Sequence, residues 1–552
     1  MTLTTGARAL VELLRHQGVE YVFGIPGATE IRFMEALEEA PGICYVLGLQ
    51  EVVCAGMAEG YARATGKPAF LSLHTVPGVA AASPLLYNAR LGRVPLVVTV
   101  GQNDTRLLQR DPHLAGDIVG IGKIHAKWST ELVHAGDIPT IISRAFKMAM
   151  QPPTGPVLVS LPQNVLEQEF DFTHEPGTVV FSRIRPDGAA LAQAVETLLR
   201  AERPLILVES GVARCDALDE VVRFAELTGS RVYQAWMSDV NFPVTHCQYL
   251  GDLDPTSAEA RDIFHDVDIL IGIGCSLFAE GFLHTETPLP TSTKIIHIDD
   301  DPWEIGKNLR TDCGIQGDIK IVLTELNAAL EAALPKDARR RAEQRAAHIS
   351  REKAESDAAL QARLAEERDQ VPISVSRLMT EIKEVMGRDT VIVDECWSAS
   401  RDLRQILDLA RPNSFFRSRK GGSIGSGLPM ALGVKLGVPD RRVIAVVGDG
   451  SAAWSMQSLW TAARYLISVT FVITNNATYR QVKLVRQAVL GDESLPGEKH
   501  EGMELDFPVI DFCVLARSMG MHGERLSRPE DLEGALRNAV ASGEPRLVEV
   551  MM

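Results

Sequence analysis

Residues 443–481 read VIAVVGDGSAAWSMQSLWTAARYLISVTFVITNNATYRQ, and two apolar runs in this stretch each end in polar residues. The runs at 443–447 and 469–474 have the continuous apolar character of buried strands, and "GDGS" is typical of a tight turn. Apolar residues at helical spacing follow that turn and predict a helix. Strand, helix and strand make a βαβ unit, whose right-handed crossover brings both strand ends to one edge of a parallel sheet. Open α/β folds bind their ligands at this edge.

Asp449 and Asn476 follow these two strands, so the pattern predicts that they meet at the edge. Both offer side-chain oxygens, and Thr478 can add a backbone carbonyl. Such oxygen ligands, with positions left for phosphate oxygens, suit Mg²⁺. Gly448 and Gly450 carry no side chain, so backbone N–H groups can approach a phosphate closely. The stretch predicts a site for a metal-bound diphosphate, although a glycine-flanked aspartate by itself often only makes a turn.

The whole chain has 552 residues and is 45% hydrophobic, which is too long for a single core. Short apolar runs alternate with helical stretches along most of it, the rhythm of parallel sheets with crossover helices. We therefore predict an α/β protein with three consecutive doubly wound parallel-sheet domains at 1–180, 181–335 and 372–552. Residues 336–371 are rich in alanine and mixed charges, which favours a solvated helical linker over a partner-binding arm.

Composition excludes several classes of protein. The formal net charge of −16 would repel a phosphate backbone, so nucleic acid is not an expected partner. Eight cysteines without a CxxC pair predict reduced, buried thiols rather than disulfides or zinc ligands. The N-terminal stretch lacks the pattern of a signal peptide, and no run of about 18 apolar residues occurs. We expect a soluble, cytoplasmic protein that does not enter a membrane.

Glu51 is a second candidate for chemistry. It follows an apolar strand and opens a helix in "LQEVVCAGMAEGYARATGKPAF", so its surroundings should be partly dry. Taken alone, Glu51 is most simply a first-turn glutamate favoured by the helix dipole.

Several motifs together identify a family. They are FGIPGATE (23–30), LQEVVCAGMAEGYARATGKPAFLSLHT (49–75), GPVLVSLP (155–162), GGSIGSGLP (421–429) and the opening stretch through NNATY. Over essentially its whole length the chain resembles the thiamine diphosphate (ThDP)-dependent 2-oxoacid decarboxylase and acetolactate synthase superfamily, and benzoylformate decarboxylases most of all. The resemblance implies pyrimidine-binding (PYR), middle and diphosphate-binding (PP) domains, with ThDP and Mg²⁺ as cofactors. It also implies a homodimer as the smallest active unit and a homotetramer as the usual assembly.

The resemblance assigns cofactor contacts residue by residue. Glu51 would share a proton with the aminopyrimidine N1′, and Asp449, Asn476 and the Thr478 carbonyl would bind the metal. Gly422 would accept from the pyrimidine amine through its carbonyl, and Ile424 would be the wedge that bends the cofactor, although ordinary packing explains an apolar residue there equally well. The further cofactor contacts implied are Ser398, Gly448, Gly450, Ser451 and Tyr479.

Two histidines and two departures bear on the substrate. His74 and His284 match positions of active-site histidines, where they would transfer protons and stabilise a developing alkoxide; a loop histidine such as His284 is as often only solvated. Ala28 stands where benzoylformate decarboxylases have a serine that contacts the substrate carboxylate. Val485 falls about where an aromatic residue lines the phenyl pocket. The positive charges of Arg480, Lys483 and Arg486 could favour an anionic substrate or could be an exposed helix face.

The implied reaction is non-oxidative decarboxylation of a 2-oxo acid to an aldehyde by a carbon–carbon lyase, with carboligation as a second outcome of the same intermediate. A carboligase that resembles acetolactate synthase or handles acyl-CoA is the alternative. A noncatalytic α/β protein that keeps ThDP as a structural ligand is a third hypothesis, and Glu51 argues against it because a binding module needs no carboxylate at N1′.

Overall fold

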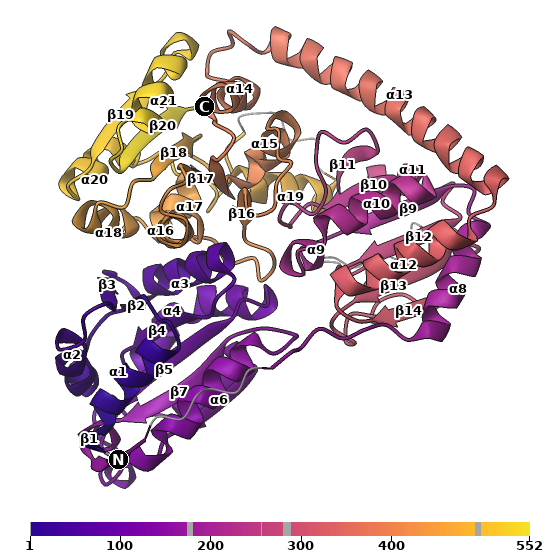
Figure 1. The fold of residues 1–552 in the computed structure, drawn as a ribbon. Coiled ribbons are helices and arrows are strands. Elements are labelled where there is room, and N and C mark those ends of the chain that lie inside the picture. Colours follow the sequence, from indigo (N-terminus) through magenta and orange to yellow (C-terminus); the bar gives the residue numbers. More distant parts are fainter. Residues whose placement is uncertain (1, 174–179, 255–256, 280–288, 492–497) are drawn as a thin grey trace. The chain divides into compact units, whose positions relative to one another are not determined.

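The computed structural model describes residues 2–173, 180–254, 257–279, 289–491 and 498–552. Its contacts divide the chain into two compact units (Figure 1). The first unit contains Met1–Phe181, Val385–Ser398 and Ser418–Met552, and the second contains Ser182–Glu384 and Ala399–Arg417. The first unit therefore combines both ends of the chain.

A parallel six-stranded sheet forms the N-terminal half of the first unit, in the order β3-β2-β4-β5-β7-β6. The strands β4, β5 and β7 are fully buried and mostly apolar, as expected where helices cover both faces, whereas the edge strands β3 and β6 are only partly buried. The strands are β2 (Tyr21–Gly24), β3 (Cys44–Leu47), β4 (Ala69–Leu73), β5 (Leu96–Gln102), β6 (Trp128–Glu131) and β7 (Val157–Pro162). The helices are α1 (Gly6–His16), α2 (Ile31–Glu38), α3 (Glu51–Thr65), α4 (Thr75–Leu91), α5 (Ile118–His125), α6 (Ile138–Met150) and α7 (Gln163–Glu167), and β1 (Thr2–Thr5) pairs antiparallel with β8 (Glu169–Phe172).

A second parallel sheet forms the C-terminal half of the first unit, where β15, β17, β18, β20 and β19 lie side by side in that order. These strands are β15 (Val391–Glu395), β17 (Val443–Gly448), β18 (Thr470–Asn475), β19 (His522–Leu526) and β20 (Arg546–Met551). The helices are α16 (Gly427–Gly437), α17 (Asp449–Trp454), α18 (Ser458–Tyr465), α19 (Arg480–Leu490), α20 (Phe512–Ser518) and α21 (Leu532–Ala541).

One local prediction for this half differs from the structure. The turn and single helix expected after β17 are two short helices, with α17 starting at Asp449 itself. The break between them falls at the buried Ser455, whose φ of −137° lies outside the helical region. The apolar spacing continues across this break, so it gave no sign of the interruption.

Helices α3 and α16 join the two halves of the first unit at unusually short range. A Cβ atom at Gly433 would lie 1.9 Å from the Met57 carbonyl oxygen, and one at Gly60 would lie 2.2 Å from the Met430 carbonyl oxygen. Only glycine permits this backbone-to-backbone approach. Near the start of both helices, Gly56 of α3 contacts Pro429 of α16. Near the end of both, Gly437 of α16 contacts Ala64, Thr65 and Tyr61 of α3. The two helices are therefore parallel, with their N-termini at the same end.

The second unit contains a parallel sheet in the order β11-β10-β9-β12-β13-β14. Its strands are β9 (Pro204–Val208), β10 (Arg231–Ala235), β11 (Tyr249–Leu253), β12 (Ile269–Ile273), β13 (Lys294–Asp299) and β14 (Cys313–Gln316). Its other elements include α8 (Gly188–Leu199), α9 (Gly211–Arg214), α10 (Leu218–Thr228), α11 (Ala258–Phe264), α12 (Ile319–Ala333), α13 (Lys336–Glu366), α14 (Val375–Val385), α15 (Ser400–Ile406) and β16 (Phe415–Arg417). The three parallel sheets confirm the predicted fold class.

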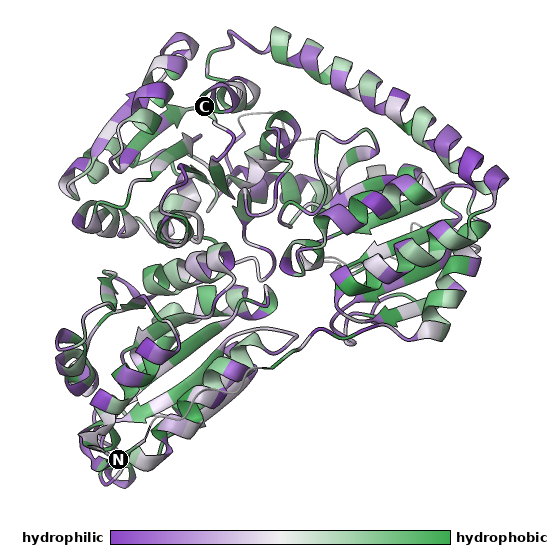
Figure 2. Cartoon of the chain, in the orientation of Figure 1, coloured by the Kyte–Doolittle hydropathy of each residue, from purple (hydrophilic) through white to green (hydrophobic). Residues whose placement is uncertain are grey.

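Hydropathy follows this architecture. The strands are mostly green in Figure 2, whereas α13 alternates purple with green along its length.

All eight cysteines are free thiols, but the prediction that all are buried is wrong for Cys44 and Cys247, which are exposed. Cys44 begins the edge strand β3, where less of the chain covers it. Within the described residues, no helix combines the length and apolar character needed to cross a lipid bilayer.

Candidate active site

The carboxyl ends of β15, β17 and β18 form one edge of the C-terminal sheet, which we call the diphosphate edge. Gly448, the last residue of β17, pairs with Thr474 of β18, so Asp449 and Asn476 leave neighbouring strands at the same level. The Asp449 carboxylate accepts hydrogen bonds from the backbone N–H groups of Gly450 and Ala477. The structure thus brings the two predicted metal ligands together.

The diphosphate edge fits a divalent cation. Asp449 is buried, and in the part of the chain that the structure describes its Oδ2 atom has no hydrogen-bond partner. Burial raises the pKa of this carboxyl to about 6, which is the expected effect of placing a charge where no cation compensates it. The Asn476 Oδ1 atom accepts from the Thr478 N–H at 3.1 Å, and the Thr478 carbonyl accepts from Arg480 N–H at 2.9 Å and keeps a second lone pair. These three oxygens suit Mg²⁺.

The glycines around Asp449 are required by their neighbours. A Cβ atom at Gly450 would lie 2.5 Å from the Tyr479 ring, so a larger residue would displace the ring. Gly448 caps the start of α17, and Ser451 is buried in its first turn. The predicted cofactor contacts Gly448, Gly450, Ser451 and Tyr479 are therefore gathered around the two metal ligands.

Glu395, at the end of β15, also lies at the diphosphate edge, and sequence reasoning missed it. Its buried carboxylate accepts hydrogen bonds from the N–H groups of Gly425 (2.9 Å), Ser426 (3.1 Å) and Gly427 (2.6 Å), and from the Ser426 hydroxyl (3.1 Å). These donors belong to the segment that carries the predicted contacts Gly422, which is exposed, and Ile424, which is half-buried. Ser398, another predicted contact, is half-buried in the turn Trp397–Ala399 that follows β15.

The carboxyl ends of β2, β3 and β4 form a second edge, in the N-terminal sheet, which we call the pyrimidine edge. Glu51 opens α3 behind its N-cap residue Gln50, whose side chain accepts from the Val52 N–H. A Cβ atom at Gly78 would lie 3.2 Å from the Glu51 Oε1 atom, so the carboxylate faces the first turn of α4. Burial raises the pKa of Glu51, and the nearby His74 partly offsets this. The structure therefore brings Glu51 and His74 to one place.

His74 is held by a buried glutamate. Its Nδ1 atom lies 2.9 Å from the Glu30 Oε2 atom, and Glu30 also accepts from the Gly27 N–H (2.9 Å) and the Thr29 hydroxyl (2.6 Å). An Nδ1–H that donates to a carboxylate leaves the imidazole Nε2 for other partners. The sequence predicts no role for Glu30, and its place in the motif FGIPGATE beside Ala28 is the one signal that points to it.

The remaining predicted residues are distributed as follows. Ala28 is exposed in the turn Ala28–Glu30 of the pyrimidine edge, and Val485 is half-buried on α19. His284 lies outside the described residues. Lys483 forms an ion pair with Glu504 at 2.7 Å, so its charge is already compensated.

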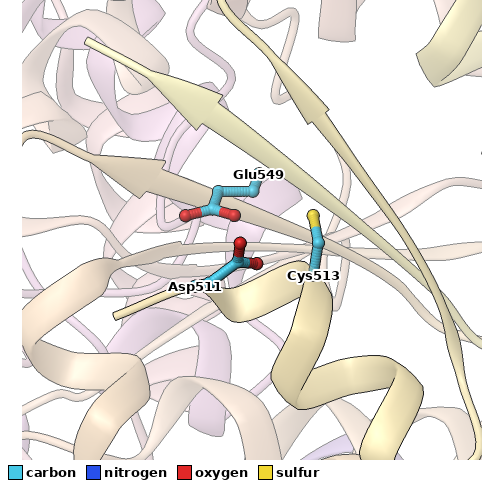
Figure 3. Close-up of side chains that lie close together, drawn as sticks. All are labelled: Asp511, Cys513 and Glu549. Carbon is cyan, nitrogen blue, oxygen red and sulfur yellow. The ribbon is translucent and has the colours of Figure 1, made fainter. Parts of the chain in front are cut away.

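One cluster of possible metal ligands lies elsewhere, at Asp511, Cys513 and Glu549 (Figure 3). Arg525 bonds to both Glu549 oxygens, at 2.9 and 3.2 Å, and lies 3.3 Å from Asp511. Burial raises the pKa of the Cys513 thiol to about 12, so it stays protonated and is a poor metal ligand. The cluster is best described as an ion-pair network. The Asn475 side-chain amide also donates a hydrogen bond to the Glu549 Oε1 atom, at 2.7 Å.

Comparisons with known proteins agree with this geometry. Family profiles described as thiamine pyrophosphate enzyme N-terminal TPP binding domain, central domain and C-terminal TPP binding domain match residues 4–121, 191–326 and 398–550. A benzoylformate decarboxylase from Pseudomonas aeruginosa is 32% identical over 98% of both chains. The chain belongs to the thiamine pyrophosphate enzyme family. This confirms the resemblance on which the residue assignments rest.

Members of the family with different activities are similarly related to this chain. The acetolactate synthase large subunit of Haemophilus influenzae is 30% identical over 98% of this chain and 92% of its own. The solved structure of a Rhodococcus jostii ThDP-dependent 4-hydroxybenzoylformate decarboxylase superposes with a TM-score of 0.85 at 27% identity, covering 100% of this chain and 99% of that one. Family membership therefore supports a ThDP-dependent enzyme and leaves the substrate to be argued from the site.

Proposed function

We propose that this protein is a ThDP- and Mg²⁺-dependent decarboxylase that converts a 2-oxo acid to an aldehyde and CO₂. The observation that carries the proposal is the arrangement of Glu51 beside a histidine whose Nδ1 is bonded to buried Glu30. Bound ThDP supplies the electron sink that allows CO₂ to leave. An aldehyde forms only if a proton then reaches carbon, and His74 is suited to deliver it.

The chain's own residues have separable tasks. Burial raises the pKa of the Glu51 carboxyl, which favours uptake of a proton, so Glu51 is suited to exchange a proton with the pyrimidine N1′ atom. Glu30 fixes the ring of His74 so that Nε2 carries the proton transfer. Asp449 and Asn476, with the Thr478 carbonyl, would hold Mg²⁺.

A second copy of the chain would complete each site. Glu51 contacts α4 at Gly78, whereas Asn88 of the same helix binds Ser423 beside Gly422. These contacts are ten residues apart (88 − 78 = 10), or about 15 Å along the helix, which is longer than one pyrimidine ring. Within one chain, Glu51 and Gly422 are thus poorly arranged to serve the same ring. This supports a homodimer as the minimal active unit. A homotetramer is implied only by the family resemblance.

The second unit offers a reason to prefer a decarboxylase over a flavin-dependent synthase or an acyl-CoA-handling enzyme. Its strand order is that of dinucleotide-binding folds, whose ligands lie between the loops after β9 and β12. Here a Cβ atom at Gly211 would lie 2.4 Å from the Gly274 Cα, so the two loops touch. The Ser276 N–H, in the loop after β12, donates at 2.9 Å to the carboxylate of Glu209, in the loop after β9, so a side chain of this protein already occupies that N–H group.

Ala28 and Val485, the two residues that the sequence predicts for the substrate pocket, give that pocket little polar character. Ala28 offers no side-chain hydrogen bond to a carboxylate, and Val485 offers an aliphatic rather than an aromatic surface. We therefore propose a 2-oxo acid with an aliphatic or small aromatic side chain. Carboligation of the same substrates is the second candidate reaction, favoured by the relatedness to acetolactate synthases.

The test is an assay of the purified protein with ThDP and Mg²⁺ on a panel of aliphatic, aromatic and CoA-linked 2-oxo acids, with and without an acceptor aldehyde. Release of CO₂ and aldehyde without an acceptor is the expected result. Product formation only with an acceptor would replace the decarboxylase by the carboligase. No turnover, with Glu51→Gln binding ThDP as the parent does, would favour a noncatalytic binding protein.

A further inference from the structure

The segment Gly421–Ser426, which we call the wedge loop, carries Gly422 and Ile424 into the start of α16. Three of its glycines, Gly421, Gly422 and Gly425, have positive φ angles of 96°, 74° and 93°. Glycines with such angles have many alternative conformations available. A loop of this composition needs external anchors to hold one conformation.

The first anchor is Asn88, near the end of α4. Its Nδ2 donates to the Ser423 carbonyl at 2.8 Å, and the Ser423 N–H donates to its Oδ1 at 3.1 Å. The side chain is 1% exposed, and a Cβ atom at Gly421 would lie 2.2 Å from its Oδ1. An amide that satisfies both backbone groups of one residue fixes the orientation of that residue and of its neighbours.

The second anchor is Glu395, at the end of β15. Its carboxylate binds the next three backbone N–H groups of the chain, at Gly425, Ser426 and Gly427. When Glu395 is ionised these bonds are charge-assisted, and such bonds are stronger than those between neutral groups. The two anchors grip the wedge loop on either side of Ile424, one from the N-terminal half of the unit and one from the C-terminal half.

We propose that Asn88 and Glu395 are positioning residues that hold the wedge loop, and so set where the Gly422 carbonyl and the Ile424 side chain meet ThDP. The inference rests on the proposed ThDP chemistry for its functional part. The anchoring itself concerns only this chain and is measurable without any cofactor.

The test uses Asn88→Ala and Glu395→Gln, with Asn88→Asp as a variant that keeps the acceptor and loses the donor. Ser83→Ala on the same helix is the matched control, because its hydroxyl bonds to Val79 and His125 and does not touch the loop. Hydrogen–deuterium exchange of the apoprotein should accelerate at least about tenfold in the peptide that covers residues 421–427. Asn88→Ala and Glu395→Gln remove acceptors of loop N–H groups, and Asn88→Asp removes the bond that holds the Ser423 carbonyl. The Ser83→Ala protein should exchange there as the parent does.

With ThDP and Mg²⁺ present, the exchange of the cofactor C2 proton should slow by about tenfold or more in Asn88→Ala and Asn88→Asp, because a small misplacement lowers the rate strongly. Unchanged loop exchange in all three variants would overturn the anchoring. Faster loop exchange with parental C2-proton exchange would overturn the link to the cofactor. A parent protein that binds no ThDP would instead refute the proposed function while the apoprotein result stands. If Glu395→Gln does not fold, the two Asn88 variants decide the outcome alone.

Discussion

At the diphosphate edge the functional side chains are held by backbone groups, whereas at the pyrimidine edge they are held by other side chains. Asp449, Asn476 and Glu395 accept from N–H groups a few residues away or in one adjacent loop. His74 depends on Glu30, which lies 44 residues earlier in the chain. For Asp449 and Asn476 the first arrangement follows from glycines and strand ends that are visible in the sequence, whereas Glu395 depends on a loop 30 residues away. The second requires two distant side chains to meet, and it can change with a single substitution.

The Glu51→Gln substitution should have the largest effect of the changes that test this difference between the two edges. If the diphosphate edge binds the cofactor and the pyrimidine edge activates it, kcat should fall by about 10³-fold, as for loss of a general acid–base group. The dissociation constant of ThDP should change much less. Steady-state kinetics and a fluorescence titration with ThDP measure the two effects.

The exposed Glu38 at the end of α2 provides the control, and Glu38→Gln should behave as the parent does. A Glu51→Gln protein that retains parental kcat would remove the pyrimidine edge from the chemistry.

A pH titration of the apoprotein probes the diphosphate edge. Burial raises the pKa of Glu395 to about 7 from the ordinary 4.5, and the four donors oppose this only in part. The folded protein then holds a proton that the unfolded chain has released, so the associated stability is present below pH 4.5 and is lost as the pH rises through about 7. The loss should be on the order of 3 kcal/mol over this window.

Urea denaturation of the parent and of Glu395→Gln at pH 5 to 8 checks this sign. The parent should lose stability relative to the variant as the pH rises. A difference between the two proteins that is independent of pH would show that Glu395 keeps one charge state throughout.

Glu30→Gln tests whether the pyrimidine edge depends on a side-chain pair. A neutral amide can donate to the His74 Nδ1 atom and so favour the wrong tautomer, and kcat should fall by about tenfold. Glu35→Gln, on the exposed face of α2, is the control and should leave kcat unchanged.

The smallest expected effect is the activity recovered when two inactive variants, Glu51→Gln and Asp449→Ala, are mixed, dissociated and allowed to reassociate. If each site takes one edge from either of two chains, a mixed dimer has one intact site. Equal mixing should then restore about a quarter of the parental activity. If both edges of a site come from the same chain, every site in the mixture carries a lesion, and no activity should return.

The sequence was informative where chemistry follows the chain locally. The end of β17, its glycines and the end of β18 predicted that Asp449 and Asn476 would meet, because neighbouring parallel strands share a register. Glu395 and Asn88 gave no such signal, since their partners lie 30 and 335 residues away. The local sequence does not distinguish a buried glutamate that binds a loop from a glutamate on the surface. Tertiary packing, rather than periodicity, decides between these states.

The glycine contacts between α3 and α16 have a mechanical consequence. At Gly60 and Gly433 no side chain separates the two backbones, so little compressible material lies between the helices there. We therefore expect α3 and α16 to move together as one rigid body, so that a displacement of one helix is transmitted to the other. Any displacement of Glu51 at the head of α3 would then be accompanied by a displacement of the loop that enters α16.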